Sequence, residues 1–593
     1  MNTKATHSVS ASVNVVRRSA DDGVNASASQ TLHANPLLNR LLKARGMQHA
    51  KELEFSLADL PSFEQLPNID AAVQRLATAV TKRERILIVG DYDCDGATST
   101  ALALNALTAM GANDVHYLVP NRFDFGYGLS PEIVDVAAKQ SPALILTVDN
   151  GVASNEGVDR ANKLGIDVVV TDHHLPPVQL PNAMAIVNPN LTNSKFPTGA
   201  LAGVGVIFYV MLALRAHLKL ADWFSDELPE PKLANLLDLV AIGTVADVVP
   251  LDSVNRTLVE QGLRRIRAGV TRPGVLAMCK VAGRESAELA AVDIGFAIGP
   301  RLNAAGRLDD ISTGIQCLLA DSETDAMSVA QELNALNQER RTIEQGMRKE
   351  AEILVSRTLQ ELPAGQSPMS LCLYEPHWHQ GVIGILAGRL KETLNIPVFV
   401  FAAENESDED ATDRQLKGSG RSIPGLHIRD ALMAVVAHKP GLLKKFGGHA
   451  MAAGLSLSHS DLEAFSHAFD AEVRAALDNR PPSRQFDSDG ELSADEFNLE
   501  NAELLRYCCP WGQEFPEPIF DGEFTIQTCR VLKERHLKMQ LQPSGLEGVL
   551  DAIAFNQTLE DPVGQTLQMV YRLEVNSFRG RRSPQLQILY IKP

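Results

Sequence analysis

The chain has 593 residues, which is more than one hydrophobic core can organise, and this length predicts three or four domains. With 45% hydrophobic and 22% charged residues, it has the composition of an ordinary globular protein. The formal net charge of −18 argues against a uniformly basic nucleic-acid binder. It leaves open an enzyme in which bound cations and local basic patches offset the acidic total.

The first 38 residues are expected to form a disordered tail. Residues 1–35 are rich in Ser, Ala, Asn and Thr and lack the apolar segment of a targeting peptide. The seven cysteines are odd in number and include no Cys-x-x-Cys pair, which argues against a disulfide framework or a zinc ribbon. The cysteine pattern fits a reducing cytoplasm best, and no apolar run long enough to span a bilayer stands out.

A first α/β domain is predicted over residues 39–270. Apolar strands alternate with helical segments from about residue 85 to residue 189, which is typical of a parallel sheet with right-handed crossovers. Apolar helical segments at 202–220 and 232–246 should complete this domain.

A helical connector is predicted over residues 271–360. Its main element is a long helix over 322–361, where apolar residues recur at helical spacing without a proline. We expect this helix to bridge two domains; the alternative is a helix packed inside one domain.

A second α/β domain is predicted over residues 361–478, with strands at 371–374 and 398–401. An acidic surface loop at 404–413 and a polar strand or turn at 416–422 follow, and residues 479–485 form a linker.

The segment 485–593 changes character, because short β-branched runs alternate with turns. This pattern predicts a small β-barrel, with an oligonucleotide-binding (OB) fold as one candidate; a generic β-sandwich fits the pattern equally well. The whole chain is therefore expected to be α/β with a C-terminal β-domain.

Carboxylates and imidazoles follow three buried strands of the first domain. Residues 86–96, 144–151 and 168–174 each begin as an apolar strand and end in Asp or His. The carboxyl ends of parallel strands meet at one sheet edge, where ligands bind in open α/β folds. Five aspartates and two histidines at such an edge would be unfavourable without cations between them, so the sequence predicts a metal-dependent hydrolase. They are Asp91, Asp93, Asp95, Asp149, Asp172, His173 and His174.

Each group also has a simpler interpretation. The alternating aspartates at 91, 93 and 95 resemble part of a calcium loop or a solvated acidic loop, although the buried strand before them and the missing downstream ligands count against calcium. The alternative for Asp172 is a helix N-cap without a metal, and the alternative for Asp247 is an ordinary residue in the last turn of a helix. Imidazole combined with carboxylate suits manganese, zinc or iron better than calcium.

Such a set could hold two divalent ions about 3.5–4 Å apart, with one carboxylate bridging them. The ions would then clamp both sides of an in-line attack on phosphorus. The protein without metal should be inactive.

At these residues the sequence resembles the DHH phosphoesterase superfamily, whose name-giving motif is Asp172-His173-His174. Within it, the motifs are most similar to bacterial 5′→3′ exonucleases specific for single-stranded DNA. The matching motifs lie at residues 90–96, 147–151, 243–247, 301–308, 378–384 and 447–454. The resemblance spans roughly residues 39–593 and implies a DHH domain, a DHH-associated domain and a C-terminal OB-like domain.

The resemblance also implies roles for the site residues. Asp149 would bridge two Mn²⁺ ions, for which Mg²⁺ can substitute, and His174 would act with Asp149 in catalysis at the scissile phosphate. Asp91 stands where relatives carry an outer or alternative ligand. The full implied metal set is Asp91, Asp93, Asp95, Asp149, His173 and Asp247.

A 5′-terminal phosphate requires fixed donors, and Ser419 with Arg421 supplies a hydroxyl and a bidentate fork. Tyr127 could stack on a base, and a narrow channel lined by Arg301, Asn303 and Arg307 would exclude a duplex. For each arginine the alternative is an ordinary ion-pair residue. The predicted nucleic-acid contacts are Arg122, Tyr127, Arg301, Asn303, Arg307, His379, Gln380, Ser419, Arg421 and His449.

The resemblance implies release of 5′-mononucleotides from single-stranded DNA in repair and recombination. A single-strand-binding protein and a helicase are implied partners, and we expect a monomer. Two rivals remain: a phosphoesterase acting on pyrophosphate, short oligoribonucleotides or cyclic dinucleotides, and a non-catalytic single-strand binder. The sequence contains no feature that reads a 2′-hydroxyl, so activity on RNA stays open.

Overall fold

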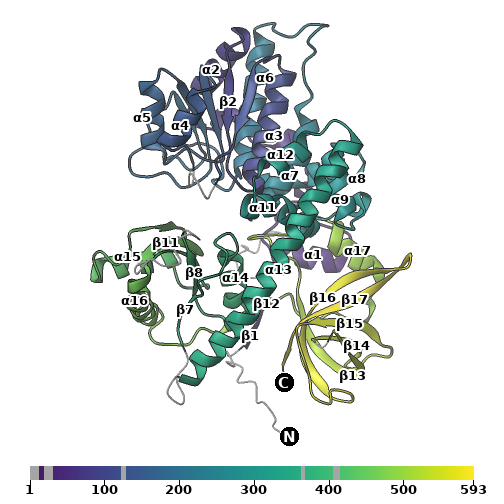
Figure 1. The fold of residues 1–593 in the computed structure, drawn as a ribbon. Coiled ribbons are helices and arrows are strands. Elements are labelled where there is room, and N and C mark those ends of the chain that lie inside the picture. The colour runs from purple at the N-terminus through teal and green to yellow at the C-terminus, as the bar shows by residue number, and fades with distance from the viewer. Residues whose placement is uncertain are drawn as a thin grey trace. The chain divides into compact units, whose positions relative to one another are not determined.

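The computed structural model describes residues 13–18, 31–121, 128–361, 368–404, 414–533 and 535–592. The chain divides into two compact units, which are treated separately (Figure 1). One comprises residues 17–337 and 488–593, and the other comprises residues 338–487 and the residues up to 16.

The first unit contains a five-stranded, fully parallel sheet with the strand order β3-β2-β4-β5-β6. This confirms the predicted parallel α/β domain. Its strands are β2 (Ile86–Val89), β3 (Val115–Leu118), β4 (Leu144–Val148), β5 (Asp167–Thr171) and β6 (Ala185–Val187).

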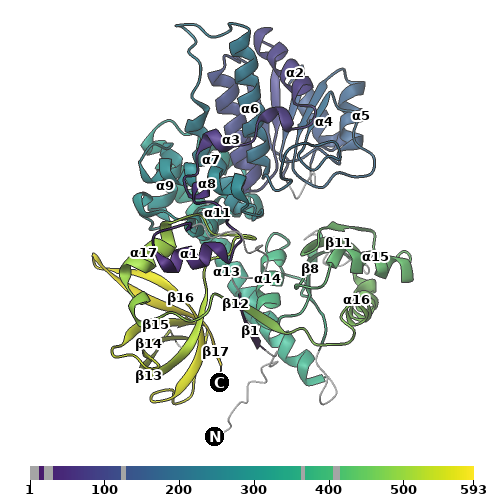
Figure 2. The same cartoon turned by 180° about the vertical axis from the view of Figure 1, so that it is seen from behind.

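Helices cover both faces of this sheet (Figures 1 and 2). Because side chains alternate along a strand, Ile86 and Ile88 join the core under α2, α3 and α6, whereas Leu87 and Val89 join the core under α4 and α5. These helices are α2 (Ile69–Thr81), α3 (Cys94–Ala109), α4 (Pro131–Ala138), α5 (Asn155–Lys163) and α6 (Gly203–Leu220).

Helix α6 is apolar and long enough to cross a membrane by length and composition, with 18 residues and a mean hydropathy of 1.5. This corrects the expectation that no segment of the chain is long and apolar enough. The helix is 67% buried within the structure, and its side chains, including Ile207 and Val210, belong to the main core of the domain. Its hydrophobicity is therefore explained by packing.

Several helices predicted as a connector belong to the first domain instead. Leu302, Ile311 and Ile315 pack into the same core as the sheet, because α9, α11 and α12 lie against it. The helices after β6 are α7 (Leu237–Ala246), α8 (Ser253–Arg267), α9 (Pro273–Val281), α10 (Ala291–Asp293), a π-helical turn (Ile294–Ile298), α11 (Gly299–Leu308) and α12 (Ser312–Leu319).

The predicted long helix is α13 (Glu323–Glu361), 39 residues in one run. Its residues up to 337 belong to the first unit and the remainder to the second, so it passes from one unit to the other as expected.

The second unit is built on a mixed sheet of order β10-β11-β9-β8-β7, in which only β7 and β8 run parallel. The strands are β7 (Leu371–Tyr374), β8 (Val398–Ala403), β9 (Gln415–Arg421), β10 (Lys445–Gly448) and β11 (Ala452–Ser458). Its helices are α14 (Ile383–Leu394), α15 (Ile428–His438) and α16 (Leu462–Ala476). Most of the predicted acidic loop, residues 405–413, lies outside the described residues.

The C-terminal segment is a closed barrel of order β13-β14-β15-β17-β16, which decides against the sandwich alternative. A parallel pair of β15 with β17 and an antiparallel pair of β13 with β16 close it. The strands are β13 (Phe520–Leu532), β14 (His536–Pro543), β15 (Leu550–Phe555), β16 (Thr566–Phe578) and β17 (Arg581–Lys592), preceded by α17 (Leu499–Tyr507).

Two parts of the predicted disordered tail are ordered. Strand β1 (Val13–Arg17) forms a two-stranded sheet with β12 (Arg484–Ser488), and α1 (Pro36–Lys43) begins within the predicted tail. Leu37 and Leu41 of α1 pack into the core of the barrel, which explains why the helix forms there. Short 3-10 helices occupy Ala50–Leu53, Leu57–Asp59, Phe63–Gln65, Leu233–Leu236, Ser286–Glu288, His459–Asp461 and Ala494–Glu496.

Candidate active site

The first sheet reverses its strand order at β2. Because β3 lies on one side of β2 and β4 on the other, the loops after β2 and β4 diverge and leave a crevice at the carboxyl edge. Asp91 and Asp93 follow β2, Asp149 follows β4 and His173 follows β5. The topology thus brings the residues singled out from the sequence to one place.

The loop after β2 is held by one of its own side chains, Asp93, and by Asn303 on α11. The Asp93 carboxylate caps α3, because its Oδ1 accepts the Asp95 N–H at 2.9 Å and the Gly96 N–H at 3.1 Å. Asn303 on α11 accepts the Cys94 N–H at 2.8 Å. Because Asp91 and Asp95 are both buried, the solvated acidic loop is ruled out.

The Asp95 carboxylate faces the start of α6. Its oxygens accept the Gly203 N–H at 2.6 Å and the Val204 N–H at 2.9 Å, where the helix dipole favours negative charge. A Cβ on Gly203 would lie 2.6 Å from Asp149 Oδ1, so only glycine lets α6 approach both carboxylates.

Asp149 adopts a left-handed backbone with φ of 62°, which turns its side chain into the crevice. His173 Nε2 lies 3.1 Å from Asp149 Oδ1 and 3.5 Å from Asp247 Oδ2. Asp247, at the end of α7, is therefore brought to the same cluster, as its sequence context predicts.

Asp172 orients the histidines and lies beside the cluster. Its Oδ1 accepts the N–H groups of His173 at 2.7 Å and His174 at 3.1 Å and lies 2.8 Å from His174 Nδ1, while its Oδ2 accepts the Val152 N–H at 2.8 Å. Burial raises the pKa of Asp172, but the hydrogen bond from His174 and its charge bring that pKa below its ordinary value. Burial lowers the pKa of His174, but the hydrogen bond and charge of Asp172, together with the charges of Asp91 and Asp93, raise it by more.

The clustered donors could hold divalent cations. Three sets of ligand atoms each lie within 4.8 Å of one another: Asp149–His173–His174, Asp95–His173–Asp247 and Asp91–Asp93–Asp149. Burial and the charge of Asp93 raise the pKa of Asp95 to about 7. Burial and neighbouring aspartates raise the pKa values of Asp149 and Asp247 well above the ordinary range. Such carboxylates hold protons unless cations replace them, so the donor set fits Mn²⁺ or Mg²⁺.

In the second unit, a cluster of polar side chains on β9 lies against the start of α14. Lys417, Ser419 and Arg421 alternate along β9 and therefore share one face of the strand. Arg421 Nη1 donates to Ser419 Oγ at 3.2 Å, and a Cβ on Gly384, in the first turn of α14, would lie 2.9 Å from both side chains. Burial lowers the pKa of Arg421, because it disfavours the charged guanidinium.

The other predicted contacts in this unit lie near the same strand. Gln380 accepts a hydrogen bond from Lys417 Nζ at 3.3 Å, and His379 Nδ1 accepts the Gly381 N–H at 3.0 Å just before α14. The backbone N–H of His449 bonds to Ala452, which is the strand partner of Arg421.

The predicted contacts on α11 behave differently. Arg301 is turned into the fold: it is 7% exposed, and its guanidinium donates to Asn334 Oδ1 and to the Ala297 carbonyl. Asn303 supports the loop after β2, as described above, and Arg307 is half-buried on the last turn of α11. Arg301 thus satisfies a backbone carbonyl of the π-helical turn, and its predicted role as a channel-lining contact stays a prediction. Arg122 and Tyr127 lie outside the described residues.

Sequence reasoning missed several residues that position the site. Asn188 donates to the His174 carbonyl at 2.9 Å and Asn190 to the His173 carbonyl at 2.6 Å. The Asn-x-Asn pair directly after the apolar strand β6 was the available signal, because polar residues at that sheet edge belong to the site. Lys417 was also missed, and its alternation with Ser419 along one strand was the available signal.

Comparisons with known proteins agree with this arrangement. Family models match residues 85–244 (DHH family, N-terminal domain), 368–475 (DHHA1 domain) and 488–590 (RecJ OB domain). The single-stranded-DNA-specific exonuclease RecJ of Dickeya dadantii (strain 3937) is 52% identical over 561 residues, which cover 94% of this chain and 96% of that protein. The chain belongs to the RecJ family.

Solved structures of that family share the fold. The crystal structure of RecJ from Thermus thermophilus in complex with Mn²⁺ is 29% identical, has a TM-score of 0.78, and the match covers 98% of this chain and 79% of that one. The corresponding complex with Mg²⁺ is 27% identical, with a TM-score of 0.72 and coverage of 98% and 78%. The predicted fold class and the predicted superfamily are thus confirmed.

Proposed function

We propose that this protein is a metal-dependent 5′→3′ exonuclease that degrades single-stranded DNA to 5′-mononucleotides. The convergence of Asp95, Asp149, His173 and Asp247 at the point where the strand order reverses carries the proposal. The names of the relatives, which describe single-stranded-DNA-specific exonucleases, support the substrate.

The proposed metal ligands are Asp93, Asp95, Asp149, His173 and Asp247, with Asp91 as an additional or alternative ligand. Two Mn²⁺ ions are proposed, with Mg²⁺ able to replace them. Asp149 and His173 each belong to two of the three donor sets, and Asp149 is the proposed bridge because it has two carboxylate oxygens to offer. When bound, the ions supply positive charge that polarises the phosphodiester and acidifies a water molecule. The left-handed backbone of Asp149 and the α6 cap of Asp95 fix these carboxylates before substrate arrives.

His174 is the proposed partner of Asp149 in catalysis. With its Nδ1 side against Asp172, its Nε2 points to the other side of the ring, where it can hydrogen-bond a phosphate oxygen. Asp172, Asn188 and Asn190 hold the His173–His174 segment from three directions and thereby keep the imidazole in one orientation.

The polar cluster on β9 is the proposed site for the 5′-phosphate and gives the enzyme its direction. Ser419 offers a hydroxyl and Arg421 a guanidinium fork next to Gly384 in the first turn of α14, and these two groups together match a phosphate dianion. Gln380 and Lys417 extend this set, and His379 and His449 are proposed contacts to the adjoining backbone.

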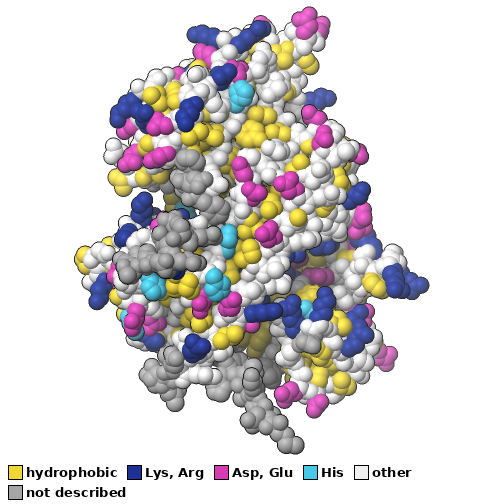
Figure 3. Space-filling model, in the orientation of Figure 1, with side chains coloured by type: hydrophobic (Ala, Val, Ile, Leu, Met, Phe, Trp, Pro, Cys, Tyr) yellow, Lys and Arg dark blue, Asp and Glu magenta, His cyan; other side chains and the backbone are white. Residues whose placement is uncertain are grey.

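The barrel is the proposed site for the more distant part of the strand. Figure 3 shows Lys and Arg side chains gathered at the tip of the β16–β17 hairpin. There Phe578 is 64% exposed, and the Arg579 guanidinium lies 5.2 Å from the centre of its ring. Basic residues next to an exposed aromatic ring are typical of sequence-tolerant single-strand binding.

The decisive test is Mn²⁺-dependent shortening of a 5′-phosphorylated single strand that is labelled at its 3′ end. We expect progressive shortening from the 5′ end in the wild type. We expect no cleavage by Asp149→Ala, with single-strand binding still measurable. Cleavage of a cyclic dinucleotide in preference to the long strand would favour the rival phosphoesterase, and binding without any cleavage in Mn²⁺ would favour a non-catalytic binder.

The cellular setting is proposed on the resemblance alone. A monomeric enzyme of the cytoplasm would act in DNA repair and recombination, where a helicase and a single-strand-binding protein would supply its substrate.

A further inference from the structure

A second cavity lies beside the ligand-bearing end of α7 and has no role in the mechanism above. Its volume is about 510 Å³, within the range of ligand pockets. It is formed by the turn after α7, the π-helical region, the segment after α17, and β16 of the barrel. Its lining includes Val245, Val248, Phe296, Arg506, Trp511, Gln513 and Arg572.

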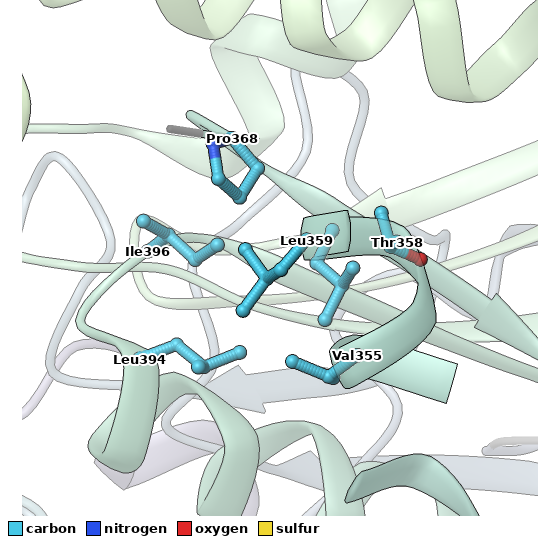
Figure 4. A pocket seen from close by; sticks show the side chains of 7 residues that line it. Val355, Thr358, Leu359, Pro368, Leu394 and Ile396 are labelled. Atoms are coloured by element: carbon cyan, nitrogen blue, oxygen red, sulfur yellow. The ribbon is translucent and has the colours of Figure 1, made fainter. Parts of the chain in front are cut away.

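This cavity differs from the small one at the end of α13, shown in Figure 4. That cavity measures about 10 Å³, which is roughly the space of one water molecule, and its walls are almost entirely apolar. It is a packing gap, too small for a ligand. Of these two cavities, the larger one combines volume with polar groups.

Flat apolar surfaces line the larger cavity. Phe296, on the π-helical turn, is 69% exposed although it is a large hydrophobic residue. Trp511 stacks on Phe515 with centroids 5.2 Å apart, and its Nε1 donates to the Leu505 carbonyl at 2.6 Å, so the orientation of its ring is fixed. The exposed ring of Phe296 is suited to stacking on a planar aromatic ligand, and the fixed Trp511 gives the same cavity a rigid wall.

The two arginines of the cavity each form an ion pair with a carboxylate. Arg506 pairs with Asp293 at 2.7 Å, and Arg572 pairs with Glu517 at 3.1 Å. A guanidinium has five N–H donors, so each arginine can still donate while its charge is offset. Together with the exposed amide of Gln513, this chemistry favours an uncharged heteroaromatic ring with carbonyl and ring-nitrogen acceptors over an isolated anion.

The cavity borders both parts of the protein to which a strand would bind. Val245 and Val248 flank Asp247 in the sequence, so the turn that bears a proposed metal ligand also forms a wall of the cavity. Arg572 belongs to β16 of the barrel. A strand that reaches from the metal centre to the barrel can therefore place a base here.

We propose that this cavity binds one nucleobase of the single-stranded substrate, a short distance from the scissile phosphate. The proposal rests on the proposed function, because it takes the occupant from the substrate itself. The base stacks against Phe296 and receives hydrogen bonds from Arg506, Gln513 or Arg572.

The test is a scan with single abasic residues. Oligonucleotides that are identical except for one abasic residue, placed in turn at positions 2 to about 10 from the 5′ end, are given to the wild-type enzyme in Mn²⁺. We expect kcat/KM for release of the 5′-terminal nucleotide to fall roughly ten-fold at one position, as for loss of one stacked base.

Phe296→Ala shows whether the cavity causes this effect. On the intact strand, the variant should have a kcat/KM that is lower by the same factor. On the strand that is abasic at that position, the substitution should cause no further decrease in kcat/KM. Gln513→Ala should behave in the same direction. Leu220→Ala, which removes an 87% exposed apolar side chain at the end of α6, is the matched control and should retain the wild-type profile.

If Phe296→Ala and Gln513→Ala changed kcat/KM by one common factor for all oligonucleotides, or left it unchanged for all of them, the base site would be refuted. That result would leave the cavity to another class of ligand, such as a protein partner. Failure of the proposed function looks different, because the intact strand would then not be cleaved at all.

Discussion

Replacing Asp172 with Asn changes almost no volume but removes a buried acceptor. The carboxylate accepts hydrogen bonds on both oxygens, one side from Val152 and the other from His173 and His174. An amide can keep one side only. If its oxygen keeps the histidines, its NH₂ group faces the Val152 N–H, and a buried unsatisfied donor costs about 1–3 kcal/mol. Loss of the negative charge weakens the bond to His174 by about 1 kcal/mol more.

The expected total for Asp172→Asn is about 2–4 kcal/mol of unfolding free energy. The lowered pKa of Asp172 agrees with a destabilising effect of this substitution, because it means that hydrogen bonds and nearby charges outweigh the cost of burying the carboxylate. Urea unfolding in EDTA measures this without a contribution from metal. Activity in saturating Mn²⁺ should fall about 10–100-fold, as for other residues that orient catalytic groups.

Asp114→Asn is the matched control for this change. Asp114 is at the exposed start of β3 and bonds to Arg85 and His116, so its replacement should leave unfolding and activity close to the wild type. If Asp172→Asn unfolded within about 0.5 kcal/mol of the wild type and retained full activity, the assigned positioning role would be wrong.

Four further outcomes are expected. Mn²⁺ at 100 times its dissociation constant should add about 2.7 kcal/mol to the unfolding free energy, an effect that Asp149→Asn should largely remove; equal stabilisation of both proteins in a thermal melt would contradict the metal assignment. Arg421→Lys should lower the preference for a 5′-phosphate over a 5′-hydroxyl in competition, since Lys lacks the bidentate fork; an unchanged ratio would refute the phosphate site. Asn303→Ala should raise the Mn²⁺ concentration for half-maximal activity several-fold, whereas Asn105→Ala on α3 should not; identical titrations would argue against support of the metal loop. Burial and the charge of Glu517 raise the pKa of Glu574, so ionising this side chain destabilises the folded state. The destabilisation is absent below the pKa of the unfolded chain and reaches its full size above the pKa of the folded protein. Glu574→Gln should therefore stabilise the barrel more at pH 8 than at pH 4, and an equal gain at both would contradict this.

Much of the fold was predictable from local patterns. The alternation of apolar strands and helices between residues 85 and 220, and the run without proline at 322–361, depend on periodicity within one segment, which the sequence shows directly. The assignment of α9, α11 and α12 to a connector failed because periodicity shows that a helix has an apolar face but not which core receives it. Barrel closure was left open for the same reason, since the β15–β17 pair joins segments that no local signal connects.

The candidate site was predictable where donors follow strands and harder to predict elsewhere. Asp93, Asp149 and His173 could be grouped because parallel strands place their carboxyl ends at one edge. The inward turn of Arg301 could not be anticipated, since it depends on a π-helical turn and on Asn334, 33 residues away.

The sequence by itself determined the kinds of elements and the set of metal-binding side chains at the carboxyl edge of the first sheet, because both follow from short-range spacing and strand direction. Only the tertiary structure decided what each side chain contacts. Asp95 meets the α6 backbone across 108 residues, and Asn303 meets Cys94 across 209. Such contacts result from how whole helices pack, and a single chain's local pattern carries no record of that packing.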